Sequence, residues 1–411
     1  MRKKLSILFL TIVFICCFTW IKASAVPLNT GALFVIKQNG KYGFIDSSGK
    51  VRIKPQFDYA RDFKENRALV GKLVDKQLKV GFIDEQGKLV IPYTYEKVDD
   101  FNEGMAAVLM YSDGIVKTKY IDKYGKEPFS MGPYVSEGFT NGRAVIISNY
   151  KEMLLGKKGK AKVGIMDNTG KIIVEPQYEY SLSVNNLVFD EGLSPVKVGD
   201  QYGYLNKEGA LAIKSQFTNA EPFKHGIAAV EDEEGKWGYI DTVGHYVIQS
   251  QYDKAYSFQE GLAPVMNVMN GEELWGFIDK NGKYIIPTKY KDVSSFSEGL
   301  APVMEEVNGE ERWGFIDKKG KYIIPAKYKN VSPFSEGLAS VTLENAEGNN
   351  IEGYIDAKGT IVIKPQYNFA DSFRNGIASV IISDDPDGLN PMYTKYGYIN
   401  KLGKYIWKPT K

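Results

Sequence analysis

Residues 275–303 read WGFIDKNGKYIIPTKYKDVSSFSEGLAPV, and this stretch decides the fold because its pattern recurs along the chain. A glycine, Gly276, follows a large aromatic residue, and a second glycine comes six residues later. An aromatic residue then follows after eight residues, a phenylalanine after six more and a third glycine after three more. The same spacings return about every 38 residues, which is typical of a repeat architecture and not of two or three ordinary domains.

Most copies keep the pair formed by an aromatic residue and the glycine after it. The positions that define the repeat are Gly43, Gly81, Gly203, Trp237, Gly238, Trp275, Gly276, Trp313, Gly314 and Gly397. One degenerate copy has Lys119 in place of the glycine, and Val80, Val163 and Glu352 replace the aromatic residue in three others. Nearly all length variation lies between the third glycine and the next copy, which predicts surface loops there, because loops tolerate insertions and packed strands do not.

Each repeat is predicted to be a meander of three short strands. The first strand is Trp275–Asp279, and it ends in a tight turn in which Gly282 supplies a positive φ. The second is Lys283–Ile286, stopped by Pro287 because proline cannot donate to a ladder, and the third is Gly299–Val303. No segment has sustained helical periodicity, so the predicted class is all-β, built of tandem three-stranded β-meander repeats of about 38 residues.

A single repeat cannot bury enough apolar surface to stand alone, so neighbouring repeats must share their cores. Two arrangements satisfy this need, a closed propeller-like ring and an open solenoid-like array. The array starts near residue 31 with Gly31–Val35, which resembles an orphan third strand, and ends with a first and second strand at 396–407. These strands would complete one shared unit in a ring or act as caps in an open array. About ten units would be many for a propeller, which typically has 4 to 8 blades.

These features resemble the WG repeat family, also called KWG. The resemblance rests on the recurrent Trp-Gly or Tyr-Gly pair, the Gly-Lys of the first turn, the proline after the second strand and the Phe-Ser-Glu-Gly-Leu-Ala motif at 296–301. It covers essentially all of residues 26–411. The resemblance implies a bacterial, often exported, β-rich repeat protein with no agreed biochemical activity, so it brings no catalytic residues to carry over.

The N-terminal segment has the pattern of a secretory signal peptide. Three cations at residues 2–4 precede an apolar run from Leu5 to about Ile21, and residues 23–25 offer a small-residue cleavage site. We therefore expect a signal peptide at 1–25 with cleavage after Ala25, a repeat domain at 26–411, and a secreted or cell-envelope location. The alternative is that the leader is retained as an anchor. After Ile21 no apolar run is long enough for a membrane-spanning helix.

Composition argues against several kinds of partner and chemistry. The chain has 52 Lys and Arg against 50 Asp and Glu, and loss of the four cations of the leader would change the net charge from +2 to −2. This balance argues against nucleic acid as a partner. Both cysteines, Cys16 and Cys17, lie in the leader, so the mature chain would have neither a disulfide nor a nucleophilic thiol.

No set of polar residues stands out as a catalytic or cofactor site. The histidines, His225 and His245, occupy repeat positions that hold glutamate and lysine in other copies. The aspartate that ends the first strand alternates with Asn206 and Asn400, which indicates a turn residue that accepts hydrogen bonds. Glutamates before the third glycine, such as Glu298, recur too often to mark one active site. We therefore predict no enzyme activity and no cofactor, with a glycosidase pair among the carboxylates as the alternative.

A minor calcium candidate lies in the last long insertion, at Asp384, Asp385 and Asp387. Clustered carboxylates beside a glycine suit Ca²⁺, but the spacing is not that of an EF-hand and Pro386 interrupts it. An ordinary acidic turn is the favoured interpretation.

Three tryptophans, Trp237, Trp275 and Trp313, share one repeat position. If exposed, they would form a ladder suited to stacking on sugars; if buried, they belong to the core. We favour the core, because a short repeat needs their apolar area.

Two hypotheses from different classes follow. The first is an exported, non-enzymatic binding or scaffold protein that presents variable loops to a partner. The second is a cell-envelope glycan-binding or carbohydrate-active protein, so the expected partner is a protein or a cell-wall polysaccharide. The loops expected to make the contact are residues 71–79, 109–118, 150–162, 305–311, 343–351 and 381–394.

Overall fold

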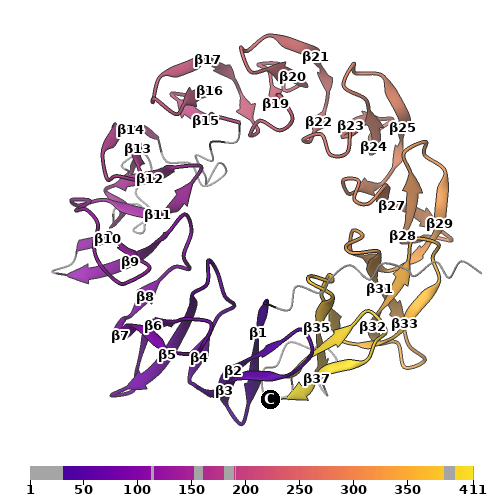
Figure 1. The fold of residues 1–411 in the computed structure, drawn as a ribbon. Helices are drawn as coiled ribbons and strands as arrows, with labels where there is room; N and C mark the ends of the chain where they lie inside the picture. The colour runs from indigo at the N-terminus through magenta and orange to yellow at the C-terminus, as the bar shows by residue number, and fades with distance from the viewer. Residues whose placement is uncertain are drawn as a thin grey trace, which may run out of the picture.

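The computed structural model describes residues 31–112, 115–151, 161–179, 189, 191–383 and 394–410. Ten small antiparallel sheets follow one another along the chain and are arranged in a ring (Figure 1). The ring is a β-propeller of ten blades, numbered 1 to 10 in chain order. The predicted all-β class is confirmed, and the closed ring is the arrangement observed. Within the described part of the chain, no helix has the length and apolar character needed to cross a membrane.

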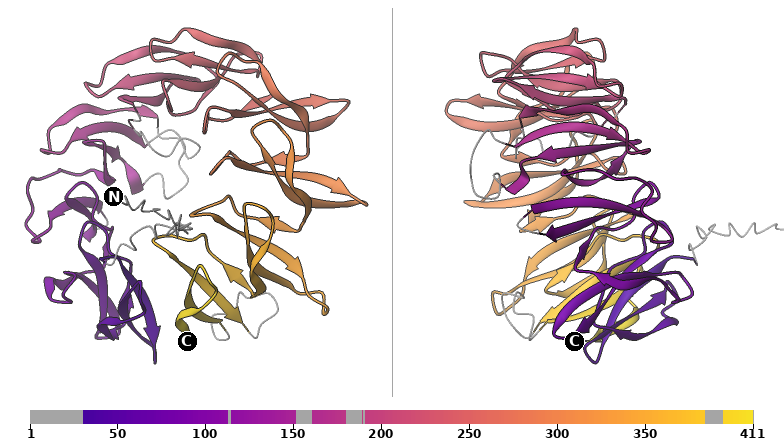
Figure 2. Two further views of the ribbon diagram at one scale, coloured as in Figure 1. Left: turned by 45° about the vertical axis from the view of Figure 1, so that its right-hand side comes forward. Right: turned by 90° about the vertical axis from the view of Figure 1, so that its left-hand side faces the viewer.

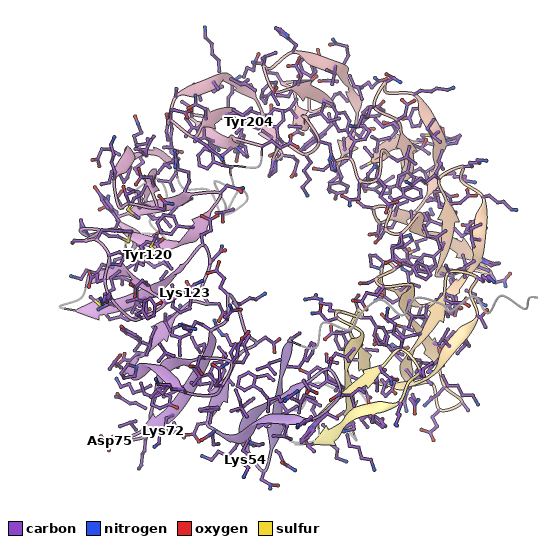
Figure 3. All side chains as sticks on the ribbon, in the orientation of Figure 1. Lys54, Lys72, Asp75, Tyr120, Lys123 and Tyr204 are labelled. Atoms are coloured by element: carbon purple, nitrogen blue, oxygen red, sulfur yellow. The ribbon has the colours of Figure 1, made fainter. Side chains whose placement is uncertain are left out.

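A complete blade has four strands side by side, from the centre of the ring outwards. In blade 7 the two-residue strand β22 (Lys254–Ala255) is innermost, β23 (Ala263–Met269) and β24 (Glu272–Ile278) follow, and β25 (Tyr284–Tyr290) is outermost (Figure 1). The strands run across the thickness of the ring, as the side view in Figure 2 shows. With the described side chains drawn, the centre of the ring stays open (Figure 3).

Among the described residues, the innermost strand is seen in all the other blades except blades 1 and 5, and blade 3 lacks the outermost strand. Blade 1 has β1 (Leu33–Gln38), β2 (Lys41–Asp46) and β3 (Val51–Phe57), and blade 2 has β4 (Tyr59–Ala60), β5 (Ala68–Val74), β6 (Gln77–Ile83) and β7 (Leu89–Tyr95). Blade 3 has β8 (Lys97–Val98), β9 (Met105–Ser112) and β10 (Ile115–Asp122), and blade 4 has β11 (Val135–Thr140), β12 (Arg143–Ser148), β13 (Lys162–Asp167) and β14 (Ile172–Glu179). Blade 5 has β15 (Leu193–Val198), β16 (Gln201–Asn206) and β17 (Leu211–Phe217). Blade 6 has β18 (Asn219–Ala220), β19 (Ile227–Glu231), β20 (Trp237–Asp241) and β21 (Tyr246–Tyr252), and blade 8 has β26 (Asp292–Val293), β27 (Leu300–Val307), β28 (Glu310–Asp317) and β29 (Tyr322–Tyr328). Blade 9 has β30 (Asn330–Val331), β31 (Leu338–Glu344), β32 (Asn350–Asp356) and β33 (Ile361–Tyr367). Blade 10 has β34 (Phe369–Ala370), β35 (Ile377–Ser383), β36 (Thr394–Asn400) and β37 (Tyr405–Thr410).

The blades are out of phase with the predicted repeat. Each blade joins the third strand of one repeat, such as β23, to the first and second strands of the next, β24 and β25. The strand at the start of the array is therefore not an orphan, because β1 pairs with β2 in blade 1. At the other end, β36 pairs with both β35 and β37 in blade 10. The ring is thus closed without a blade shared between the two ends of the array, contrary to what we expected of a ring.

A bulge in the outermost strand explains the glycine after the aromatic residue. In blade 7, residues 287–289 of β25 lie opposite the single residue Gly276. A Cβ atom on Gly276 would lie 2.5 Å from the carbonyl oxygen of Ile286, so no side chain fits there. The predicted end of this strand at Pro287 is wrong, because the proline sits within the bulge, where a missing N–H is tolerated.

The degenerate copy, which has Lys119 in place of the glycine, supports the bulge as the reason for this glycine. Lys119 stands at the glycine position of β10, and β10 is the edge of a sheet that contains only β8, β9 and β10 among the described strands. Because no bulged strand crosses this position, the lysine side chain is accommodated. The glycine and the outermost strand are therefore lost together.

The turn after the first strand also packs against the preceding blade. Asp279 Oδ1 accepts hydrogen bonds from the backbone N–H groups two and four residues later, at 2.9 and 3.0 Å. Asn206 and Asn400 accept the same bonds in their blades, which confirms the predicted role of this position. A Cβ atom on Gly282 would lie 3.0 Å from Ile248 Cγ2 of blade 6, so the turn fits closely onto its neighbour.

Contacts between blade 10 and blade 1 close the ring, and Figure 1 shows their strands next to each other. Tyr398 donates a hydrogen bond of 2.9 Å to the carbonyl oxygen of Val35, and its ring centroid lies 5.9 Å from that of Phe34. Thr410 donates to the carbonyl oxygen of Lys37. All three contacts join β1 to the last two strands.

The core lies largely between the blades, where the aromatic residues meet. Phe277 of blade 7 packs edge-to-face against Phe296 of blade 8, with ring centroids 5.0 Å apart. Trp237 and Trp275 are each only 7% exposed, and Trp313 is half-buried. The predicted core role of this position is confirmed for the first two, and the three rings do not form an exposed ladder.

Candidate functional site

The hairpins between the third and first strands lie at one end of the blades, which we call the hairpin end. Residues 71–79 and 305–311, predicted as loops, are instead paired strands joined by the two-residue turns 75–76 and 308–309. The prediction was wrong because extra residues enter as strand pairs, which lengthen a hairpin without breaking its ladder.

Of the other predicted contact segments, only residues 343–351 are described in full. Residues 109–118 belong mainly to the β9–β10 hairpin, and residues 345–349 form the turn between β31 and β32. Most of the segments 150–162 and 381–394 lies outside the described residues. The calcium candidates lie there as well, namely Asp384, Asp385 and Asp387.

Apolar side chains are exposed at the hairpin end. Leu73 is 57% exposed and Tyr111 is 61% exposed, and Val268 and Met269 beside the β23–β24 turn are also exposed. Figure 3 places Asp75, in the same hairpin as Leu73, at the outer rim of the ring. Because these side chains add little to the core, they are free to contact a partner.

The opposite end of the blades, which we call the turn end, is linked from blade to blade. Glu298 has a left-handed backbone (φ 53°), and its Oε2 accepts a hydrogen bond of 2.8 Å from the N–H of Gly337 in the next blade. The same bond joins Glu65 to Gly104, Glu103 to Gly142, Glu191 to Gly226, Glu260 to Gly299 and Glu336 to Gly376. These recurring glutamates therefore hold neighbouring blades together.

Lysines lie beside three of these glutamates, Glu65, Glu260 and Glu336, and strengthen the links that they make. Lys318 Nζ lies 3.1 Å from Glu260 Oε2. Burial alone would raise the pKa of Glu260, but Lys318 and the N–H of Gly299 outweigh burial and hold the pKa below its usual value. This carboxylate is thus ionised and engaged in structure at neutral pH.

Blade 9 has a charged residue, Glu352, at the position where most blades have an aromatic residue. In blade 7 the ring of Trp275 stacks on that of Tyr256, with centroids 5.2 Å apart. In blade 9 the same two positions hold Glu352 and Ser332. These smaller polar side chains leave cavities of about 470 and 180 Å³, both of which have Glu352 in their walls.

Glu352 lies where blade 9 meets blade 10. Its Oε2 accepts a hydrogen bond of 2.7 Å from the N–H of Ala370, and its Oε1 accepts one of 3.2 Å from Thr342 Oγ1. Burial raises the pKa of Glu352 above its usual value. Further polar side chains line the larger cavity: Lys329, Asn330, Asn349, Asn350 and Asn368.

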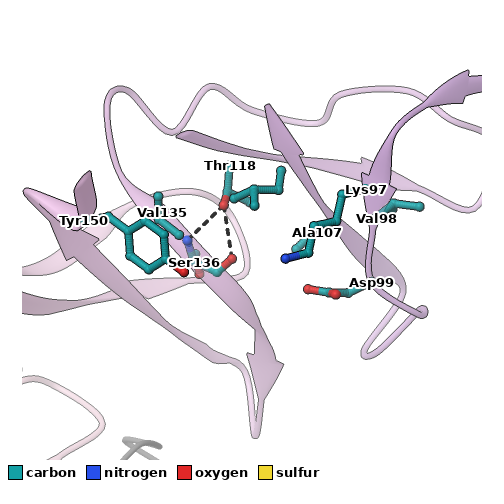
Figure 4. Close-up of a pocket in the computed structure, with 9 residues that line it drawn as sticks. Lys97, Val98, Asp99, Ala107, Thr118, Val135, Ser136 and Tyr150 are labelled. Carbon is teal, nitrogen blue, oxygen red and sulfur yellow. Dashed lines mark hydrogen bonds between the residues drawn. The ribbon is translucent and has the colours of Figure 1, made fainter. Parts of the chain in front are cut away.

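A third cavity forms where blade 3 loses its aromatic residue. Thr118 occupies that position, and a cavity of about 350 Å³ lies between blades 3 and 4 (Figure 4). Thr118 Oγ1 donates to the carbonyl oxygen of Ser136 at 3.1 Å and accepts from its N–H at 3.0 Å. Lys97 and Asp99 line the cavity on the side opposite Ser136. Burial raises the pKa of Asp99 above its usual value.

The structure gives the two histidines separate, ordinary places. His225 has the left-handed backbone of the glutamate position (φ 56°), and His245 Nδ1 lies 3.7 Å from Asp241 Oδ2 in an exposed turn. Within the described ranges, no three potential metal ligands come together. The sequence marked Glu352 as a departure from the repeat, but not as part of a site, because its cavity involves residues of the next blade.

Comparisons with known proteins concern the repeat and the fold. The family model described as "WG containing repeat" matches residues 42–72, 81–111, 164–202, 202–237, 237–267, 275–306, 313–345 and 353–384, more than half of the chain. No curated protein matches the sequence.

Similar solved structures are distant. BamB from Moraxella catarrhalis is 12% identical over 77% of this chain and 92% of that chain, with a TM-score of 0.33. The tricorn protease is 11% identical over 87% of this chain and 36% of that chain (TM-score 0.30), and Kluyveromyces lactis Hsv2 is 11% identical over 62% and 95% (TM-score 0.32). At these values the similarities carry no information on function.

Proposed function

The chain belongs to the WG-repeat family, and on that premise we propose that it is an exported, non-enzymatic binding or scaffold protein that holds a partner protein at its hairpin end. The contrast between the two ends of the blades supports this proposal. At the turn end, short turns of one kind recur and glutamates such as Glu298 link the blades. At the hairpin end, the hairpins differ in length and expose apolar side chains such as Leu73. Variation at one end of a uniform frame is typical of repeat proteins that bind partners.

Two of the longer hairpins can be shortened without changing this frame. Gly71 pairs with Val80 and Met304 pairs with Trp313, just as Lys37 pairs with Tyr42 in the shorter hairpin of blade 1. We expect that replacing residues 71–80 and 304–313 by the sequence of 37–42 abolishes partner binding. The replacement puts a tyrosine, which blade 1 has in this core position, in place of Trp313 and of Val80, so cooperative unfolding should be retained.

The partner would first be captured from cell-envelope extract and identified by mass spectrometry, and its affinity for the purified protein would then be measured. Lys280→Ala, an exposed change at the turn end, is the matched control and should leave the affinity unchanged. An affinity equal to that of the wild type after the hairpin replacement would refute the proposed binding surface.

Export is proposed from the leader at 1–25. Cell fractionation and N-terminal sequencing of the mature chain test it directly. A mature chain that starts at residue 26 supports cleavage after Ala25, whereas a cytoplasmic full-length chain contradicts export.

Glycan binding in the cell envelope is the second candidate function. It is favoured by the polar cavities at Glu352, where the repeat would otherwise place an aromatic residue. Release of reducing ends from cell-wall polysaccharide would indicate a carbohydrate-active enzyme, and binding without release would indicate recognition only.

A further inference from the structure

We propose that the two cavities at Glu352 form one binding site, which we call the Glu352 site, for a neutral oligosaccharide held between blades 9 and 10. The proposal deepens the glycan-binding candidate and does not depend on a partner at the hairpin end. The origin of the cavities, the hydrogen-bonding groups in their walls, their charge and an exposed aromatic ring support it.

The cavities arise from a local change that the fold does not need. In blade 7, Trp275 and Tyr256 fill the equivalent space with two stacked rings. In blade 9, Glu352 replaces the aromatic residue that the neighbouring blades 8 and 10 keep at this position, and it brings a carboxylate into a partly buried place, which costs stability. A position where one copy breaks a rule that its neighbours obey, at a cost in stability, indicates a functional constraint.

The walls offer both donors and acceptors of hydrogen bonds. Asn330 Oδ1 accepts a bond of 2.9 Å from the N–H of Val331, and Asn368 Oδ1 accepts one of 2.8 Å from the N–H of Ser383. These bonds orient both side-chain amides, and among the described residues neither Nδ2 has a partner. Because each sugar hydroxyl can both donate and accept, two free Nδ2 donors beside the Glu352 carboxylate suit vicinal hydroxyl groups.

The charge of the walls disfavours an anionic ligand. Lys329 Nζ is already paired with Glu344 Oε2 at 2.7 Å. The remaining charged groups are carboxylates, Glu352 in both cavities and Asp371 in the smaller one. A phosphate or an acidic sugar would be repelled, whereas an uncharged, hydroxyl-rich ligand needs no counter-ion.

An exposed aromatic ring completes the site. Phe369 lines the smaller cavity and is 46% exposed, although the same position holds Lys254 in blade 7 and Asn330 in blade 9. The repeat therefore does not require an aromatic residue here. A flat ring beside polar groups can pack against the C–H face of a sugar, while the amides bind its hydroxyls.

The hydrogen bond from the N–H of Ala370 does not by itself explain why residue 352 is a glutamate. The equivalent N–H groups of Ala220 and Val331 are bonded by the side chains of the residues just before them, Asn219 at 3.0 Å and Asn330 at 2.9 Å. An asparagine at position 369 would have served the same purpose. The chain instead has an exposed ring at 369 and a carboxylate at 352, which is the combination that a sugar site uses.

Isothermal titration calorimetry with the full mature chain tests the proposal, using cellotetraose and chitotetraose as neutral probes and inorganic phosphate and spermidine as charged ones. We expect one neutral tetrasaccharide to bind at millimolar concentration or below, with neither charged probe binding more tightly. Glu352→Trp restores the residue type of blade 7 and fills the cavities, so it should weaken binding at least about tenfold without lowering Tm. Glu352→Gln keeps the shape of the side chain and should weaken binding severalfold even if the tryptophan variant folds poorly.

Matched controls separate this site from the hairpins at 71–80 and 304–313. Phe369→Ala should weaken sugar binding, whereas Lys254→Ala, at the same position of blade 7, should not. The hairpin replacement at 71–80 and 304–313 leaves the Glu352 site intact, so its sugar affinity should equal that of the wild type. The proposal is overturned if neither tetrasaccharide binds, if phosphate or spermidine binds more tightly, or if the Glu352 variants bind sugar as the wild type does.

Discussion

Tyr398 donates a hydrogen bond of 2.9 Å to the carbonyl oxygen of Val35, although the two residues are 363 positions apart in the chain. Tyr239 makes the equivalent bond to the carbonyl oxygen of Tyr256 in the next blade, also at 2.9 Å. The ring is therefore closed by a contact that also joins consecutive blades. Burial raises the pKa of Tyr398, so its hydroxyl keeps its proton and remains a donor at neutral pH.

Removal of this hydroxyl tests the closure. Tyr398→Phe should lower the free energy of unfolding by about 1 kcal/mol, since a carbonyl oxygen loses its donor while the ring still packs. Tyr354→Phe, which breaks the equivalent bond to Asp371 at 2.6 Å, is the matched control and should have a similar effect. Urea denaturation measures both. An unchanged stability for Tyr398→Phe alone would show that the two ends of the array are not in contact.

The glycine of the Trp-Gly pair should be far less replaceable than the third glycine. Gly276→Ala places a Cβ atom 2.5 Å from a backbone oxygen, which demands a shift of the outermost strand and should cost about 3 kcal/mol. Gly299→Ala meets nothing within 4 Å and carries only the strain of a positive φ, about 1 kcal/mol. Thermal unfolding compares the two variants. Equal losses would contradict the bulge as the reason for the glycine.

The glutamate links predict a stabilising substitution. His225 stands where Glu298 and its equivalents accept a hydrogen bond from the next blade, so His225→Glu should supply the missing bond to the N–H of Gly261. We expect a gain of about 0.5 to 1.5 kcal/mol in the free energy of unfolding. His225→Gln offers a neutral amide oxygen as the acceptor in place of a carboxylate oxygen, so its hydrogen bond is weaker and the gain should be smaller. A loss of stability in the glutamate variant would argue against an equivalent geometry in blade 6.

Acid sensitivity should depend in part on Asp46. Burial alone would raise its pKa, but hydrogen bonds from Ser48 and Arg52 outweigh burial and lower the pKa to about 2. Because this pKa is lower than in the unfolded chain, Asp46 contributes stability above about pH 4 and loses that contribution as the pH falls towards 2. Asp46→Asn should therefore weaken the fall of stability between about pH 5 and pH 2. Identical pH profiles for the two proteins would contradict this role.

Local features were predictable from the sequence. The aspartate turn at Asp279 depends on a side chain and N–H groups within four residues, so its pattern is visible in any copy. The buried place of Trp275 followed from the shortage of apolar surface in one repeat. In contrast, the predicted end of the strand at Pro287 is wrong, because a bulge is defined by the strand opposite and not by the residues within it.

The sequence by itself determined that the chain is one β-rich repeat copied about ten times, because strand periodicity and turn chemistry are encoded within each copy. Only the tertiary structure decided where a blade begins, how the ends meet and which departures create a site. A periodic sequence can be divided into units at any point, whereas strand pairing selects one division. Closure depends on angles summed over all blades, and the Glu352 site depends on side chains that blade 10 brings against blade 9.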